Sequence, residues 1–315
     1  MTAWLPWRVV HDAKEPRVEW LASDGAPFTE PFFEDTLRRF LRSDPAANST
    51  AARRRTPLDV LRETAPGVAL AGLVFHVSRC GSTLVSRVLA APPGHVVVSE
   101  PPILDDLLRT SRVDPRVTDD ERIAWLRGAV RALGPADSGG GGGARRLFVK
   151  LDSWHVHALP LLLRAFPEVP RLFVYRDPIE VLVSLMRVPS LTIVRGTVTP
   201  EELGVSEAER DRWTREEHAA AILGSFFRVA RAYRSSLVPV AYDELPDRVW
   251  GALDALGWSD TDLVAMRAAA AFDAKRPGER FTPDAEAKRR GASPAIVAAV
   301  KRFTADEYAR WRACV

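Results

Sequence analysis

Residues 73–90 read LVFHVSRCGSTLVSRVLA. Residues 73–77 are apolar except for His76, as in a buried strand, and a turn at Gly81 follows them. From Leu84 onward apolar residues recur at helical spacing, so the turn leads directly into an amphipathic helix. The free N–H groups and the dipole at the start of such a helix face whatever occupies the turn. The stretch therefore predicts a strand-to-helix corner that binds an anion.

The residues around this turn suit an anion. Gly81 permits close approach of the backbone, and Arg79 adds a guanidinium at the mouth of the turn. Ser82 and Thr83 add hydroxyl donors. The pattern differs from the Walker A motif, G-x-x-x-x-G-K-[ST], because His76 replaces its first glycine and Ser82 its lysine. A plain helix cap is the alternative interpretation, since Ser and Thr are favoured capping residues.

A second strand-to-helix corner spans residues 171–185, which read RLFVYRDPIEVLVSL. Asp177 is predicted to cap the helix, and Glu180 to complete a capping box with it. Arg176 has no such structural explanation, and it stands at the carboxyl end of a strand, where α/β sheets bind ligands. Ser184 lies two turns into the helix, where a hydroxyl among apolar neighbours needs a partner.

Short apolar runs indicate the strands of the main domain. They are nearly continuous rather than alternating, which is typical of parallel strands covered on both faces. Helical patterns lie between them, so the chain is predicted to be an α/β protein built of βαβ units. The runs are Leu73–Val77, His95–Ser99, Leu147–Lys150, Leu172–Tyr175 and Val238–Tyr242.

Residues 1–66 do not show this alternation of strands and helices. They contain scattered tryptophans, several prolines and the basic run Arg53–Arg55, and only Phe32–Arg42 has a helical pattern. We therefore predict that residues 1–66 form an N-terminal extension packed on a main α/β domain of residues 67–315.

Composition and charge limit the partners. Lys and Arg number 44 against 41 Asp and Glu, and the net charge of +3 is too small to indicate a nucleic-acid binder. Only Cys80 and Cys314 are present, so no disulfide framework is expected. The N-terminus lacks the pattern of a signal peptide, and the longest apolar run, Gly67–Val77, is shorter than the roughly 20 residues that span a bilayer. We expect a cytoplasmic protein without nucleic-acid or membrane partners.

The two corners together resemble those of the sulfotransferases that use 3′-phosphoadenosine-5′-phosphosulfate, in their bacterial and tyrosylprotein branch. The Arg79–Thr83 stretch is similar to the loop that holds the 5′-phosphosulfate of the donor. Arg176 and Ser184 are similar to the pair that holds its 3′-phosphate. Val240–Leu245 is similar to a further family segment, and the resemblance covers about residues 72–260.

The resemblance implies a fold and a reaction. The fold is a P-loop-type three-layer sandwich, with a central parallel sheet flanked by helices. The reaction is transfer of a sulfuryl group from the donor to an acceptor hydroxyl or amine. The residues that it places at the donor are Arg79, Cys80, Gly81, Ser82, Thr83, Arg176 and Ser184. No metal is implied.

Sulfuryl transfer needs positive charge around the sulfuryl and leaving phosphate oxygens, and a base for the acceptor proton. Lys150, at the end of its strand, is a candidate for the charge. Three residues compete as base, in the order Glu100, Asp152 and His155. Glu100 ranks first because the resembling enzymes carry their catalytic Glu about twenty residues after the loop Arg, and Glu100 follows Arg79 by 21.

Other residues are placed by weaker arguments. Cys80 lies in the loop beside Arg79, a setting that lowers thiol pKa values, but the resembling family commonly has Ser there and a covalent role is not expected. Family members close the adenosine site with a basic, glycine-containing loop, to which Lys275, Arg276 and Arg280 are similar. A solvated charged face is the alternative interpretation of this second group.

Two other functions remain open from the residues alone. One is a P-loop small-molecule kinase or phosphotransferase, and the other is a non-catalytic nucleotide binder. The Arg176 and Ser184 pair and the absence of a Walker lysine favour the sulfotransferase hypothesis over the kinase. The acceptor is expected to be a small hydroxylated molecule, and its pocket is expected to form from Leu104–Arg112, Val188–Glu209 and the N-terminal tryptophan-containing segment. The oligomeric state is not predicted.

Overall fold

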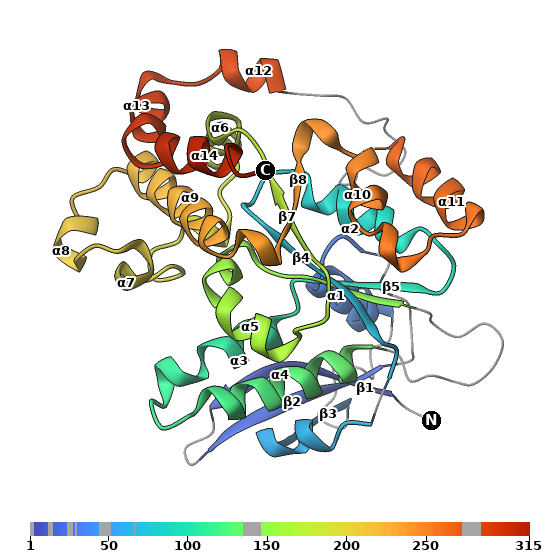
Figure 1. Ribbon diagram of the computed structural model, residues 1–315. Coiled ribbons are helices and arrows are strands. Elements are labelled where there is room, and N and C mark those ends of the chain that lie inside the picture. The colour runs from blue at the N-terminus through green and yellow to red at the C-terminus, as the bar shows by residue number, and fades with distance from the viewer. Residues whose placement is uncertain are drawn as a thin grey trace.

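Five parallel strands form the centre of the protein, in the order β5-β6-β4-β7-β8 (Figure 1). The strands are almost entirely buried because helices cover both faces of the sheet. All five predicted strands are confirmed within a few residues at their ends. Their bounds are β4 Leu70–His76, β5 His95–Ser99, β6 Arg146–Lys150, β7 Arg171–Tyr175 and β8 Val238–Ala241.

Helices lie on either side of this sheet and give the three-layer α/β arrangement of P-loop type that the sequence predicts. On one side are α2 (Ser82–Ala90), α10 (Asp247–Ala252) and α11 (Asp260–Ala270), and α11 packs on α2 (Figure 1). On the other side are α5 (Leu159–Ala165), α6 (Pro178–Arg187), α9 (Arg215–Ala232), α12 (Ala285–Arg290), α13 (Pro294–Phe303) and α14 (Ala305–Arg312). The short helices α7 (Pro200–Leu203) and α8 (Glu207–Arg210) precede α9.

The computed structural model describes most of the chain. The described residues are 3–11, 15–23, 28, 30–43, 52–65, 67–134, 146–272 and 285–315. Within them, no helix combines the length and the apolar character needed to cross a membrane.

The N-terminal residues form a small antiparallel sheet that the sequence reading missed. Its strands are β1 (Ala3–His11), β2 (Pro16–Ser23) and β3 (Arg53–Pro57), in that order. The predicted helix Phe32–Arg42 is confirmed as α1, Phe33–Ser43. The strands were hidden because tryptophan, arginine and proline interrupt the apolar alternation, and because the register of β1 shifts between Pro6 and Arg8.

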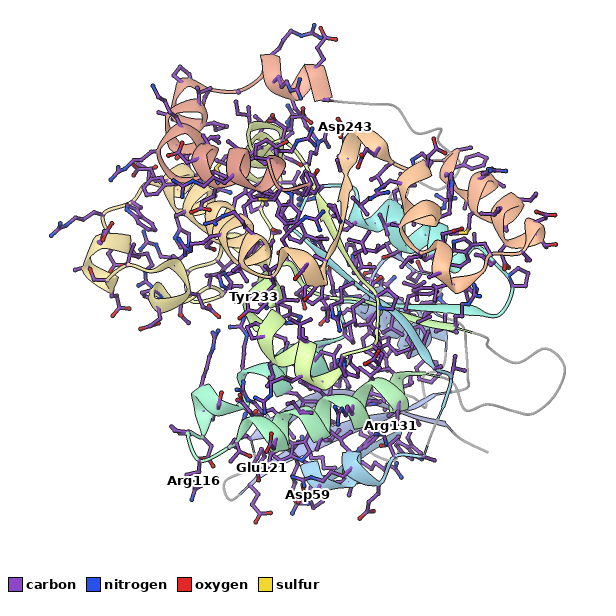
Figure 2. All side chains as sticks on the ribbon, viewed as in Figure 1. Asp59, Arg116, Glu121, Arg131, Tyr233 and Asp243 are labelled. Carbon is purple, nitrogen blue, oxygen red and sulfur yellow. The ribbon has the colours of Figure 1, made fainter. Side chains whose placement is uncertain are left out.

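This sheet packs beneath the main domain on α3 (Pro102–Val113) and α4 (Asp119–Leu133). The Val9 N–H donates to Asp106 of α3 over 2.8 Å. Trp125 of α4 donates to Asp59, in the 3₁₀ helix Leu58–Glu63, over 3.0 Å. Figure 2 shows Asp59 near Glu121 at the bottom of the molecule, where these two elements meet, with Arg131 farther along α4. The division of the chain at residue 66 stays a prediction.

Candidate functional site

The predicted anion loop connects β4 directly to α2. Ser78 and Arg79 both have left-handed backbone conformations, with φ of 66° and 49°, and Gly81 has φ of 90°. A Cβ atom at Gly81 would lie 2.7 Å from the Leu245 side chain, so glycine is needed for both space and conformation. Left-handed non-glycine residues cost free energy and concentrate at functional sites.

The loop presents several backbone donors without acceptors. In the described part of the chain, no carbonyl or side-chain oxygen accepts from the N–H groups of Arg79, Cys80, Gly81 or Thr83. They stand at the start of α2, where the helix dipole adds partial positive charge. The backbone already holds these N–H groups in a fixed orientation, and they lack only an acceptor. Such an arrangement is suited to binding an anion.

Side chains of the loop divide between the mouth and the core. Arg79 is half-buried and its Nη2 donates to the Val188 carbonyl, at the carboxyl end of α6, over 2.7 Å. Cys80 instead points into the sheet, where its thiol donates to the Val174 carbonyl over 3.2 Å. Burial raises the pKa of the Cys80 thiol to about 11, and this effect exceeds the lowering that nearby positive charge can produce. Ser82 and Thr83 are buried at the first turn of α2.

Glu100 and Lys150 form an ion pair beside the loop, with the lysine buried and the carboxylate partly exposed. The Lys150 Nζ lies 2.8 Å from Glu100 Oε1, and the lysine side chain is only 1% exposed. The backbone holds the pair together, because Glu100 follows β5, Lys150 ends β6, and the Glu100 N–H donates to the Lys150 carbonyl over 2.7 Å. Glu100 adopts φ of 56°, which turns the chain sharply after its strand. Phe32 covers the pair, with its ring centre 4.6 Å from Nζ.

The positive charge beside Glu100 keeps its carboxyl group ionised. Burial alone would raise the pKa of Glu100, but the adjacent Lys150 ammonium and the His76 ring lower the pKa to about 2. Glu100 is therefore a carboxylate across the whole neutral range. It has the charge required of a base, with its basicity restrained by Lys150.

His76 is a third member of the cluster that the sequence reading missed as a site residue. Its Nδ1 accepts the Ser78 N–H over 3.0 Å, and its Nε2 lies 3.4 Å from Glu100 Oε1. The available signal was its position as the last residue of β4, because β4 lies beside β6 and parallel strands end at one edge of the sheet.

The other two candidate bases lie farther along the chain from β6. Asp152 is buried, and burial together with the charge of Glu100 raises its pKa to about 7. Its Oδ2 lies 3.9 Å from His155 Nε2, but that nitrogen is closer to Asp105 Oδ1, at 2.9 Å. The same Asp105 oxygen accepts from Trp154 and from Arg109, over 2.6 and 2.7 Å. His155 is thus held within a cluster centred on Asp105.

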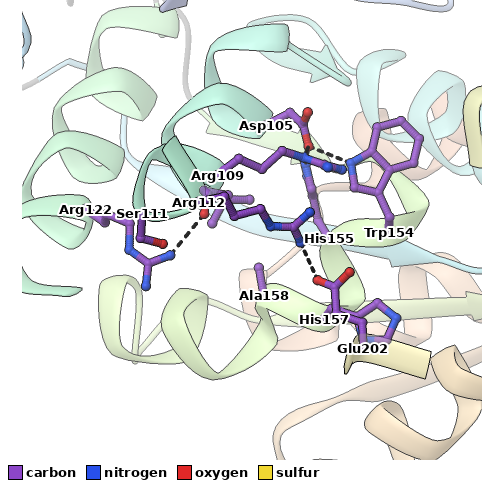
Figure 3. A pocket seen from close by; sticks show the side chains of 11 residues that line it. Asp105, Arg109, Ser111, Arg112, Arg122, Trp154, His155, His157, Ala158 and Glu202 are labelled. Atoms are coloured by element: carbon purple, nitrogen blue, oxygen red, sulfur yellow. Dashed lines mark hydrogen bonds and ion pairs between the residues drawn. The ribbon is translucent and has the colours of Figure 1, made fainter. Parts of the chain in front are cut away.

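A cavity of about 230 Å³ adjoins this cluster (Figure 3). It lies between α3, the residues before α5 and α7. Arg112 crosses it to reach Glu202 over 2.6 Å. His155 and His157 both line it but contact different elements, because His157 Nε2 lies 3.1 Å from Ser225 of α9. Its polar lining includes Asp105, Arg109, Ser111, Arg112, Arg122, Trp154, His155, His157 and Glu202.

The second corner has the predicted helix cap but not the capping box. Asp177 accepts the N–H groups of Ile179 and Glu180, over 2.9 and 3.3 Å. The Glu180 side chain does not return to the cap. Its carboxylate instead binds Arg176 over 2.6 Å and Arg289 over 2.7 Å, and two cations hold a carboxylate more strongly than one backbone N–H does. The capping-box prediction is therefore wrong.

Arg176 is held firmly at this corner. Its side chain is 4% exposed, and its guanidinium carbon lies 3.6 Å from the centre of the Tyr242 ring. It borders a cavity of about 80 Å³, lined also by Asp177, Asp243 and Arg289. Arg289 of α12 is a site residue that sequence reasoning did not single out, because only the fold brings it to Glu180.

Ser184 lies at the opposite end of α6 from Arg176. It is half-buried, and no hydrogen bond joins the two side chains in the described residues. Its carbonyl accepts the Val188 N–H, and the Val188 carbonyl in turn accepts from Arg79. The structure therefore links Ser184 to the anion loop through Val188, whereas Arg176, which follows β7, is near enough to the loop for its charge to act on the Cys80 thiol. Lys275, Arg276 and Arg280 lie outside the described residues.

Comparison with known proteins gave structural matches only. No family model and no curated protein matches the chain. The chain is similar to sulfotransferase STF9 from Mycobacterium avium, with 13% identity, 85% of this chain and 81% of that chain covered, and a TM-score of 0.40. It is also similar to the sulfotransferase domain of the Synechococcus olefin synthase, with 14% identity, 79% and 95% covered, and a TM-score of 0.39. A third similar structure is sulfotransferase STF1 from Mycobacterium tuberculosis, with 15% identity, 69% of this chain and 76% of that chain covered, and a TM-score of 0.38.

Proposed function

We propose that the protein transfers a sulfuryl group from 3′-phosphoadenosine-5′-phosphosulfate to a hydroxyl or amine of a small acceptor. One observation carries the proposal. An anion loop with open backbone donors and Arg79 adjoins an ion pair of a partly exposed carboxylate, Glu100, and a buried lysine, Lys150. His76 contacts both the loop and the carboxylate, so the two halves are one site.

In this proposal each half has a separate task. The N–H groups of residues 79–83 and Arg79 bind the 5′-phosphosulfate, and Lys150 balances charge on the sulfuryl and leaving phosphate oxygens. Glu100 accepts the proton of the acceptor hydroxyl as its oxygen attacks sulfur. The new bond joins that oxygen to sulfur, and the bond from sulfur to the bridging phosphate oxygen breaks. The products are a sulfate ester and 3′-phosphoadenosine-5′-phosphate.

Lys150 restrains the basicity of Glu100 until the donor is bound. A carboxylate with a pKa of about 2 is a weak base. A donor sulfuryl group next to Lys150 would share the ammonium, and the loss of that partner raises the pKa of Glu100. Base strength would therefore rise in the complex that needs it. This coupling supports Glu100 as the first candidate.

Asp152 and His155 remain the second and third candidates for the base. With its pKa raised to about 7, Asp152 is partly protonated at neutral pH and so is only partly available to accept a proton. His155 Nε2 is already committed to Asp105. In the proposal these two residues support the acceptor side of the site, next to the cavity of about 230 Å³.

In the proposal, Arg176 and Ser184 bind the 3′-phosphate of the donor, and Lys275, Arg276 and Arg280 are assigned to the adenosine. Glu180 accepts the Nε–H of Arg176. The Tyr242 ring, whose centre lies 3.6 Å from the guanidinium carbon, fixes the plane of the guanidinium. No metal takes part, and a cytoplasmic location belongs to the proposal, since Cys80 and Cys314 are free thiols.

Calorimetry separates this function from its two alternatives. The account predicts that 3′-phosphoadenosine-5′-phosphate binds without Mg²⁺ and at least about tenfold more tightly than ATP, a difference of about 1.4 kcal/mol. A kinase would favour ATP with Mg²⁺. A non-catalytic binder would bind the nucleotide but give no product when hydroxyl acceptors are screened with the radiolabelled donor. Preference for ATP with Mg²⁺ would contradict the proposal.

A further inference from the structure

His76 is buried between the anion loop and Glu100, and the mechanism above gives it no task. The residue is 5% exposed and ends the central strand β4. Its two ring nitrogens face different partners. Nδ1 accepts from the Ser78 backbone over 3.0 Å, and Nε2 lies 3.4 Å from the Glu100 carboxylate.

The hydrogen bond from Ser78 determines where the ring carries its proton. A nitrogen that accepts an N–H bond cannot itself bear a proton, so the neutral ring is protonated at Nε2. That nitrogen lies 3.4 Å from Glu100 Oε1, the oxygen that also pairs with Lys150, in electrostatic contact rather than in a hydrogen bond of standard geometry. The charged groups facing the ring are Glu100 and Lys150, and burial lowers the pKa of His76, which agrees with a neutral ring.

The same bond acts on the shape of the loop. Ser78 and Arg79 adopt left-handed conformations that cost L-residues about 1–2 kcal/mol each. The bond from the Ser78 N–H back to residue 76 closes a tight turn of the kind that Asx side chains form, and it holds Ser78 in this conformation. Because the following N–H groups belong to the anion loop, the shape of the loop depends on the imidazole.

We propose that His76 is a positioning residue that fixes the anion loop through Nδ1 and the Glu100 carboxylate through Nε2, and so couples donor binding to the orientation of the base. The inference rests on the proposed function for its catalytic consequence. The tautomer itself does not depend on that function. One buried ring thereby sets both halves of the site.

Two substitutions separate the two contacts. His76→Asn places an amide oxygen where Nδ1 stands, so it keeps the bond to Ser78 and loses the contact with Glu100. His76→Gln places an amide N–H near Glu100 and loses the bond to Ser78. We expect His76→Asn to bind 3′-phosphoadenosine-5′-phosphate within about threefold of the unaltered protein, while kcat falls about tenfold or more. We expect His76→Gln to lose about tenfold in affinity, with a smaller loss in kcat.

The coupling would be overturned if His76→Asn mainly lost affinity and His76→Gln mainly lost kcat. It would also be overturned if both variants lost affinity and kcat in equal proportion. Nitrogen-15 NMR of the histidines in the unaltered protein gives a second readout that needs no donor. The signal absent from both variants belongs to His76, and it should show an unprotonated Nδ1 and a protonated Nε2 at neutral pH. A protonated Nδ1 would refute the inference whatever the function. Failure of the unaltered protein to bind the nucleotide would instead refute the proposed function alone.

Discussion

Lys150 carries its charge in an almost fully buried position, and the Glu100 carboxylate is its counter-ion at 2.8 Å. Taking such a pair out of water costs free energy that the attraction only partly returns, so the pair is weak evidence for stability. Removing one partner destabilises the fold more than the pair does, because a buried charge without its counter-ion costs free energy. The pair is better explained by the chemistry of the site than by the stability of the fold.

This argument predicts a particular pattern of stability in variants. Glu100→Gln and Lys150→Met should each lower the free energy of unfolding by about 3 kcal/mol, since each leaves one group buried without its partner. The double variant should lose clearly less than the sum of the two. Urea denaturation of the four proteins measures this cycle, and a strictly additive double variant would contradict a direct pairing.

Asp152 is the residue whose titration falls near neutral pH. Its pKa is raised from 3.8 to about 7, so the folded state holds its proton more tightly than the unfolded state. The contribution of this residue to stability is therefore present at low pH and is lost as the pH rises from about 4 through about 7. Glu100, with its pKa near 2, stays ionised throughout this window.

We accordingly expect Asp152→Asn to lose less thermal stability than the unaltered protein as the pH rises from about 5 to about 8. Between about pH 4 and pH 8, kcat/KM for the donor should show no ionisation near 4.5, the ordinary pKa of a glutamate, because Glu100 is already ionised in the free protein. Any ionisation near pH 7 should disappear in Asp152→Asn. Parallel melting curves of the two proteins across this range would contradict the assignment.

At the scale of elements, the strands of the central sheet were easier to predict than the contacts between side chains of different elements. The five strands of the central sheet are continuous apolar runs, and that pattern requires two covered faces whatever the rest of the chain does. The N-terminal strands have no such pattern, because each depends on a neighbour for its register. Arg289 and Glu180 illustrate the same limit, since they are far apart in sequence and meet only because α12 packs on α6.

The segment that leads into α1 contributes Phe32 to the site. Its ring lies 4.6 Å from the Lys150 ammonium and covers the ion pair. Contacts of this kind are worth about 1 kcal/mol or more when they exclude water. The expectation that the N-terminal tryptophan-containing segment lines the acceptor pocket stays a prediction.

Phe32→Leu keeps an apolar cover but removes the aromatic face. We expect it to leave affinity for 3′-phosphoadenosine-5′-phosphate unchanged, because the ring packs on Lys150, which in the proposal faces the sulfuryl group that this nucleotide lacks. The kcat/KM for the acceptor should fall about fivefold, in line with the loss of one cation–π contact. Phe28→Leu is a matched control, since Phe28 stacks on Phe33 rather than on Lys150. Equal effects of the two changes would contradict a specific role for Phe32.

At the scale of the whole molecule, the strand order explains why these residues meet. β4 lies at the middle of the sheet between β6 and β7, and the chain leaves it toward β5 on one side and later builds β7 and β8 on the other. Ligands of α/β proteins bind at such a reversal, outside the carboxyl ends of the strands. The loop after β4, Lys150 at the end of β6 and Arg176 after β7 therefore share one edge. The position of these residues at one edge of the sheet was predictable from the sequence.

The pairing within that edge was not predictable. Apolar runs give the strands and their direction, and a parallel sheet then places Glu100, Lys150 and Arg176 at one end. They do not specify that Glu100 contacts Lys150 and His76, or that Arg176 contacts Glu180, because several rotamers of each long side chain suit the same backbone.

The crystal structure of the complex with 3′-phosphoadenosine-5′-phosphate tests the central claim most directly. The account predicts the 5′-phosphate about 3 Å from the backbone nitrogens of residues 79–83, and the 3′-phosphate at Arg176 and Ser184. A nucleotide bound elsewhere, or one whose 3′-phosphate lies far from both residues, would contradict it.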